Sequence, residues 1–198
     1  MKRTVLTILA LLAVPSLARA DSFSAAFAGT GFGQTVTVTG GSVWAGQLRG
    51  TGPAGQFDDF ISFCVDIHNY LEPTQTFKVK STNDLTPDGG QIAWLVNTFF
   101  WSIGSNAAGA GLQLAIWNVL YDNDWTLDGG AFSASSSAPR TAASEFLAAL
   151  RDNNRHSNAV FLDTRYGQDQ VTVAEPATAV LFGAATLVAA IRRRRQAA

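Results

Sequence analysis

Cys64 is the residue of this chain whose type most clearly offers chemistry. It is the only cysteine among 198 residues, so it cannot form a disulfide within one molecule. Asp66 and His68 follow at alternate positions, and Cys, His and Asp are the residue types of a cysteine hydrolase. A straight strand, however, holds positions i and i+4 about 13 Å apart. A hydrolase at this position, for which His156 is the other candidate base, therefore requires a turn after Asp66.

Two short segments carry a more specific pattern. One is Phe63-Cys64-Val65-Asp66, and the other is Leu112-Gln113-Leu114-Ala115-Ile116-Trp117. Together they resemble the two motifs of bacterial thioester domains, an aromatic-Cys pair on a strand and a Thr-Gln-x-Ala-(Ile/Val)-Trp helix start. The resemblance implies that the Cys64 thiol condenses with the Gln113 carboxamide, that ammonia leaves, and that the resulting thioester captures an amine on a surface. The supporting residues that it implies are Phe63, Asp66 and Trp117.

The residue types suit this reaction. Only a thiol or thiolate is nucleophilic enough to displace the poor leaving group of an amide, and glutamine presents a carbonyl on a flexible arm. The thioester is a stored electrophile, so apolar walls must keep it from water. Backbone amides or the Asn118 side chain would donate hydrogen bonds to polarise the carbonyl. We expect the walls to come from Phe63, Trp94, Ile116 and Trp117.

Simpler interpretations remain open for the same residues. A cysteine among apolar strand residues is most often a small buried hydrophobe, and a glutamine in such a helix most often lies beside its amphipathic stripe. Trp94, Trp101 and Trp117 would then form a core shared by two helices. The alternative for these three tryptophans is a sugar-stacking platform.

An acidic segment has part of the pattern of a calcium loop. Asp122, Asp124, Thr126 and Asp128 alternate along the chain. The sixth position lacks glycine and the twelfth lacks glutamate, both of which a calcium loop of this type needs. We therefore expect a solvated acidic turn, with weak calcium binding as the open alternative, and the sequence predicts no defined metal ligands and no cofactor.

The elements that must position these residues follow from periodicity and turn residues. Strands are predicted at 35–39, 42–48, 57–67 and 76–80, with a Gly40-Gly41 turn between the first two. Helices are predicted at 91–101, 107–121 and 139–152, and closing strands at 159–162 and 170–173. Strands, then helices, then strands indicate an α+β fold. We expect a β-rich sandwich or barrel-like domain with about three helices inserted or packed on it.

The N-terminus has the composition of a secretory signal. Lys2 and Arg3 precede an apolar run at 5–14, and Pro15 follows it. Ala18-Arg19-Ala20 fits the small-residue pattern at which signal peptidase cuts. The sequence thus predicts a signal peptide at 1–20 and an exported domain at 21–173.

The C-terminus has the composition of a second targeting signal. Glu175 and Pro176 are followed by an apolar run at 177–191 and by a basic cluster. This order resembles the PEP-CTERM sorting signal of Gram-negative bacteria, with Ala174 where that signal has its first proline. The resemblance implies recognition by an exosortase, with 174–198 as the sorting segment. We expect the apolar run at 177–191 to form a single, transient inner-membrane helix. Arginines favour the cytoplasmic side of a membrane, so the residues before 177 should lie outside. The basic cluster consists of Arg192, Arg193, Arg194 and Arg195.

Charge narrows the partners of the exported part. Between residues 21 and 176 the chain carries seven basic and fifteen acidic residues, a net charge of −8, and such a surface repels nucleic acid. We expect a cell-surface or extracellular-matrix protein that serves as an adhesion or biofilm module and not as an enzyme. Exopolysaccharide or surface amines are the expected targets. The alternatives are a non-covalent exopolysaccharide binder and a cysteine hydrolase.

Overall fold

The computed structural model describes residues 21–54, 57–153 and 157–173. The predicted signal peptide at 1–20, with Ala18 and Ala20, and the sorting segment at 174–198, with Glu175, Pro176 and the four arginines, lie outside these residues. In the described part of the chain, no helix is both long enough and apolar enough to cross a membrane.

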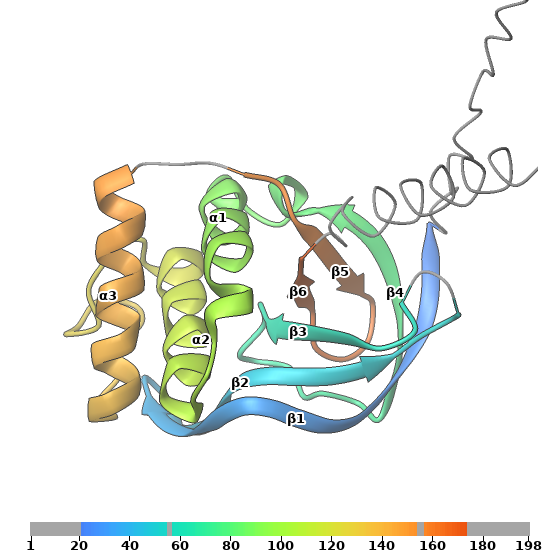
Figure 1. Cartoon of the computed structure of the whole chain (residues 1–198), viewed down its shortest axis with the longest axis horizontal. Coiled ribbons are helices and arrows are strands. Elements are labelled where there is room, and N and C mark those ends of the chain that lie inside the picture. Colours follow the sequence, from blue (N-terminus) through green and yellow to red (C-terminus); the bar gives the residue numbers. More distant parts are fainter. Residues whose placement is uncertain (1–20, 55–56, 154–156, 174–198) are drawn as a thin grey trace, which may run out of the picture.

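The described chain contains both strands and helices (Figure 1). The strands are β1 (Ser22–Val38), β2 (Gly41–Thr51), β3 (Phe60–Cys64), β4 (Thr74–Ser81), β5 (Val160–Thr164) and β6 (Gln170–Thr172). The α-helices are α1 (Gly89–Phe99), α2 (Asn106–Tyr121) and α3 (Ser137–Asn153). Two short 3-10 helices are η1 (Thr82–Asp84) and η2 (Phe100–Ser102).

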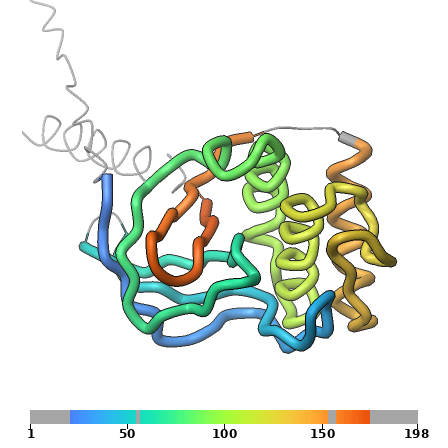
Figure 2. Tube along the Cα trace, turned by 180° about the vertical axis from the view of Figure 1, so that it is seen from behind, coloured from blue at the N-terminus to red at the C-terminus, as the bar shows by residue number. Residues whose placement is uncertain are grey.

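The six strands form a closed antiparallel barrel in the order β1-β2-β3-β6-β5-β4. Pairing of β1 with β4, in which Phe23 lies opposite Phe77, closes the ring. The three α-helices stand together beside this barrel, as Figure 1 shows from the front and Figure 2 from behind. The predicted α+β class is confirmed, and of the two predicted forms, sandwich and barrel, the chain adopts the barrel.

The β1–β2 hairpin shows where the sequence patterns succeed and where they fall short. Gly40 and Gly41 form the predicted turn, with φ of +93° and +137°, values that only glycine adopts readily. The predicted strand at 35–39 is too short, because β1 begins at Ser22 and pairs with β4 before it reaches β2. Residues 22–27 alternate between exposed and buried or half-buried side chains. Small residues such as Ala25 and Gly29 weaken the strand signal there.

Helix α2 is the central element of the helical layer. Ser105 caps its N-terminus, and the Ser105 side chain accepts a hydrogen bond from the Ala108 N–H at 3.1 Å. All residues from 109 to 119 are buried, because α2 packs against α3 on one side and against β1 and β2 on the other. Gln113 and Trp117 therefore lie at the junction of helices and barrel.

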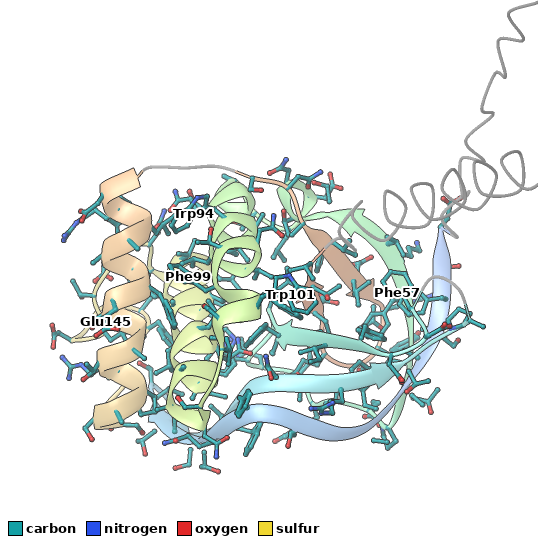
Figure 3. All side chains as sticks on the ribbon, viewed as in Figure 1. Phe57, Trp94, Phe99, Trp101 and Glu145 are labelled. Carbon is teal, nitrogen blue, oxygen red and sulfur yellow. The ribbon has the colours of Figure 1, made fainter. Side chains whose placement is uncertain are left out.

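The interior is divided into two apolar clusters. The larger one joins the three helices to β3 and β6 and contains Phe63, Cys64 and Trp117. The smaller one lies within the barrel; Phe23 and Phe57 stack in it with ring centroids 4.2 Å apart. Phe57 is far from the helices in Figure 3, where Trp94 and Phe99 lie on the helical side.

Candidate functional site

Cys64 is the last residue of β3, and the chain turns immediately after it. The predicted strand at 57–67, with Cys64 at its middle, is therefore wrong at both ends. The physical reason at the C-terminal end is the Asp66 side chain. Its carboxylate accepts hydrogen bonds from the His68 main-chain N–H, at 3.1 Å, and from the Asn69 side chain. Such local bonds favour a turn over a continuing strand.

The Gln113 carboxamide is held by the main chain of Cys64. The Cys64 N–H donates to Gln113 Oε1 at 2.9 Å, and Gln113 Nε2 donates to the Cys64 carbonyl at 2.7 Å. Strand β2 pairs with β3 only as far as Ser62, so at Cys64 the glutamine side chain takes the place of a strand partner. Cys64 is 4% exposed and Gln113 is 1% exposed. The structure thus brings the two residues into direct contact in a dry environment.

The Cys64 thiol is bonded to the turn that follows it. It donates to the Asp66 carbonyl at 3.0 Å, and the Asp66 N–H donates to the sulfur at 3.2 Å. Burial strongly raises the pKa of the Cys64 thiol, and the hydrogen bond with Asp66 offsets only part of that effect. The sulfur is therefore a neutral thiol at neutral pH.

Trp117 lies one helical turn after Gln113, so both side chains are on the same face of α2. It is 1% exposed. Its indole N–H is near enough to lower the pKa of the Cys64 thiol slightly, yet it makes no hydrogen bond of ordinary geometry. A buried donor without an acceptor is costly. Trp117 thus presents an unused hydrogen-bond donor beside the sulfur.

A pocket of about 610 Å³ opens above these residues. Cys64, Gln113 and Trp117 line its inner part, and Trp44, His68 and Tyr70 also contribute to its lining. The buried pair therefore borders a space that is large enough for a small ligand or for the end of a longer one.

His68 does not complete a hydrolase in this arrangement. The turn that such an enzyme requires is present, and His68 lines the same pocket. Its ring, however, packs edge-on against Tyr121 at 5.8 Å, while the thiol bonds to the main chain of Asp66. A catalytic cysteine needs a lowered thiol pKa, and here burial raises it. His156 lies outside the described residues.

The expected walls of the site are only partly correct. Trp117 lines the pocket, but Trp94 does not; it packs against Phe99 at 5.7 Å on the helical side of the molecule (Figure 3). Phe63 is fully buried and packs edge-on against Phe100 at 6.2 Å. Ile116 is fully buried in the helix–barrel core. Phe63 and Ile116 therefore belong to the apolar core next to the site and do not line the pocket.

Asn118 does not polarise the carbonyl as expected. Its side chain points into the loop after α2, where Nδ2 donates to Asp124 Oδ1 at 2.9 Å and to the Thr126 carbonyl at 2.6 Å. Its Oδ1 accepts from the Trp125 N–H at 3.1 Å. The donor on the Gln113 carbonyl is instead the main-chain N–H of Cys64.

The acidic loop is organised by its own hydrogen bonds. Asn118 and Thr126 donate to Asp124 and lower the pKa of its carboxyl. Asp122 accepts from the Phe132 N–H at 3.2 Å, and Asp128 pairs with Arg140. Among the residues at 21–54, 57–153 and 157–173, no group of three or more His, Cys, Asp or Glu side chains is placed to hold a metal ion.

Gln168 is a site residue that the sequence patterns did not indicate. Its side chain donates to the Asp66 carbonyl at 3.2 Å and to the Asn69 carbonyl at 3.0 Å, and it lines the pocket. It thereby fixes the turn that holds the sulfur. Its place depends on pairing of β6 with β3 across more than a hundred residues, and no local pattern reports such a contact.

Comparison of the chain with family models, with curated proteins and with solved structures finds no match. The function is therefore inferred from the geometry and chemistry of this site and from the patterns at the two chain ends.

Proposed function

We propose that this chain is an exported attachment module in which Cys64 Sγ and Gln113 Cδ join in an internal thioester. The observation that carries the proposal is the clamp on the carboxamide, whose oxygen and nitrogen both bond to the main chain of Cys64. This clamp holds the acyl carbon beside the cysteine, in a buried position that borders an open pocket.

The contacts supply what the condensation needs. The Cys64 N–H polarises the Gln113 carbonyl and stabilises negative charge on Oε1 as the sulfur adds. The Sγ–Cδ bond forms, the Cδ–Nε2 bond breaks, and the thiol proton leaves with the nitrogen as ammonia. Thiol, amide, thioester and ammonia are all neutral species. The desolvation that disfavours a thiolate therefore does not oppose the overall reaction, and it shields the product from hydrolysis.

The same contacts favour later capture of a nucleophile. Once ammonia has left, the Cys64 carbonyl no longer has the Gln113 Nε2 partner that it has in the amide form. An incoming N–H or O–H group can donate to it while attacking Cδ. The attack frees the Cys64 thiol and leaves the ligand bonded to Gln113. Each molecule reacts once, as befits an attachment device and not a turnover enzyme.

Export and sorting complete the proposal. The signal peptide at 1–20 and the PEP-CTERM-like segment at 174–198 support delivery by signal peptidase and an exosortase to the cell surface or extracellular matrix. Removal of residues 174–198 should release the protein from the inner-membrane fraction, as measured by immunoblotting of separated fractions. An unchanged distribution would contradict this part of the proposal.

The alternative of a polysaccharide platform made of Trp94, Trp101 and Trp117 has less support. Trp117 is 1% exposed and Trp94 is half-buried, whereas Trp101 is 71% exposed. Stacking sugars need several aromatic faces that are open to solvent together. These three side chains do not offer them.

Methylamine provides the test of covalent capture. Full-length protein exported by a Gram-negative host should gain one methylamine at Gln113, and Cys64 should then react with iodoacetamide after unfolding. Cys64→Ala is the matched control, because the Gln113 clamp uses only the main chain of residue 64. Failure of the wild-type protein to gain methylamine, or equal gain by Cys64→Ala, would overturn the proposal.

A further inference from the structure

The outer part of the pocket is aromatic and uncharged. Trp44 on β2 is 41% exposed and Tyr70, in the β3–β4 connection, is 87% exposed; both line the pocket and so lie where it meets solvent. The polar side chains around them include Thr30, Ser42 and Asn69. Of the described residues that line this pocket, none is a lysine, arginine, aspartate or glutamate.

Gly33 leaves room for the partly exposed Trp44 side chain. On β1, the paired strand, a Cβ at Gly33 would lie 2.9 Å from Cζ2 of the Trp44 indole. The absence of a side chain at Gly33 therefore allows the indole to lie across β1. An aromatic surface that is positioned by the backbone but left open is suited to stacking against a ligand.

The inner end of the pocket provides a second, independent indication of a ligand. The Trp117 side chain lines the pocket, and its buried indole N–H lies beside the Cys64 sulfur, a weak acceptor, without a hydrogen bond of ordinary geometry. Leaving such a buried donor without a full hydrogen bond is unfavourable. A ligand that carries hydrogen-bond acceptors into the pocket removes that cost.

These features fit one class of ligand. Sugar rings stack their C–H faces on aromatic side chains, and their hydroxyl groups bond to uncharged amides and hydroxyls. A lysine ammonium, by contrast, requires a carboxylate when it is desolvated. The carboxylate of Asp66, two residues after Cys64, already accepts bonds from His68 and Asn69. We propose that the pocket binds a neutral carbohydrate chain between Trp44 and Tyr70, and that a sugar hydroxyl is the nucleophile captured at Gln113.

The covalent step rests on the proposed function; carbohydrate binding by the pocket does not. In that step the hydroxyl oxygen bonds to Cδ of Gln113, the Sγ–Cδ bond breaks, and the hydroxyl proton ends on the Cys64 sulfur. The product is a glutamyl ester and a free thiol. The Trp117 N–H, beside the sulfur, stabilises it as it leaves.

The test uses full-length wild-type protein on an array of neutral polysaccharides, acidic polysaccharides and polylysine, with retention measured before and after a denaturing wash. We expect wash-resistant retention on neutral polysaccharides and none on polylysine. For each variant, retention is divided by the extent of methylamine addition to the same variant. On this scale Trp44→Ala and Tyr70→Ala should each lower retention about tenfold. The matched controls are Trp101→Ala and Tyr166→Ala, which remove exposed aromatic side chains outside this pocket and should leave retention unchanged.

The outcomes separate this inference from the proposed function. Methylamine addition together with retention on polylysine alone, or on no surface, would overturn the carbohydrate inference and leave the thioester intact. Retention that disappears in the denaturing wash and depends on Trp44, with no methylamine addition, would support carbohydrate binding and refute the thioester. An equal effect of Trp44→Ala and Trp101→Ala would overturn the pocket as the binding site.

Discussion

The two apolar clusters of this domain are built on different principles. The barrel cluster, around Phe23, Phe57 and Phe77, is made of apolar side chains whose rings stack or lie tilted against one another. The helix–barrel cluster surrounds a cysteine, and a buried glutamine lies against it. Apolar packing alone is sufficient for stability. The clusters thus differ in that one includes a hydrogen-bonded carboxamide on the main chain of Cys64, whose net contribution to stability is small although its removal is costly.

The largest effect is expected in the barrel cluster. Phe77 is fully buried, so Phe77→Ala should lower the free energy of unfolding by about 3–5 kcal/mol. Urea unfolding followed by tryptophan fluorescence measures this change, with Phe32→Ala, an exposed phenylalanine, as the control. Folded Phe77→Ala protein should still gain methylamine. A loss of methylamine addition in the folded variant would erase the distinction between the two clusters.

The next effect separates structure from chemistry within the site. Compared with methylamine-opened protein, in which the side chain is an amide again, Gln113→Ala should cost about 2–4 kcal/mol of unfolding free energy, because it leaves the Cys64 N–H and carbonyl buried without partners. Compared with methylamine-opened protein, which has no Sγ–Cδ bond, Cys64→Ala removes only the thiol and should cost about 1 kcal/mol. Both variants should lose methylamine addition completely. Equal stability losses in the two denaturation curves would show that the clamp is not structural.

The smallest effect depends on pH. In methylamine-opened protein the native state keeps the Cys64 thiol protonated, because burial raises its pKa, while the unfolded chain ionises at the ordinary value of 9.0. The unfolded state then binds fewer protons, so stability falls as pH rises above about 9, by up to about 1.4 kcal/mol per pH unit.

Cys64→Ala is the reference for this titration. Tyr121, whose pKa burial raises to about 12, is present in both proteins, so its contribution cancels in the difference. The unopened protein should match Cys64→Ala, since a thioester carries no thiol proton. Identical alkaline slopes for opened protein and Cys64→Ala, measured by urea unfolding at several pH values, would contradict a buried neutral thiol.

Sequence patterns predicted the parts of the fold that depend on local chemistry. The Gly40-Gly41 turn and the helix that begins after Ser105 lie where capping and turn residues indicate. The first half of β1 was missed because its small residues carry little strand signal, and its pairing with β4 is distant in sequence. The end of β3 was misplaced because alternation continues past Asp66, whose side-chain bonds end the strand.

The same division applies to the site. The paired motifs directed attention to Cys64 and Gln113, which the fold places in contact, while the thioester itself remains a prediction. Gln168 and the pocket aromatics Trp44 and Tyr70 depend on strand pairing and on a turn. Those contacts come from the three-dimensional arrangement, and no local sequence motif predicts them.

Intact mass measured in acid, where a thioester stays closed, tests the central claim most directly. The native protein should be lighter by one ammonia than the mass calculated for the termini that peptide mapping identifies, and Cys64→Ala should show no deficit. A wild-type protein of full calculated mass, with Cys64 completely alkylated once unfolded, would contradict the account.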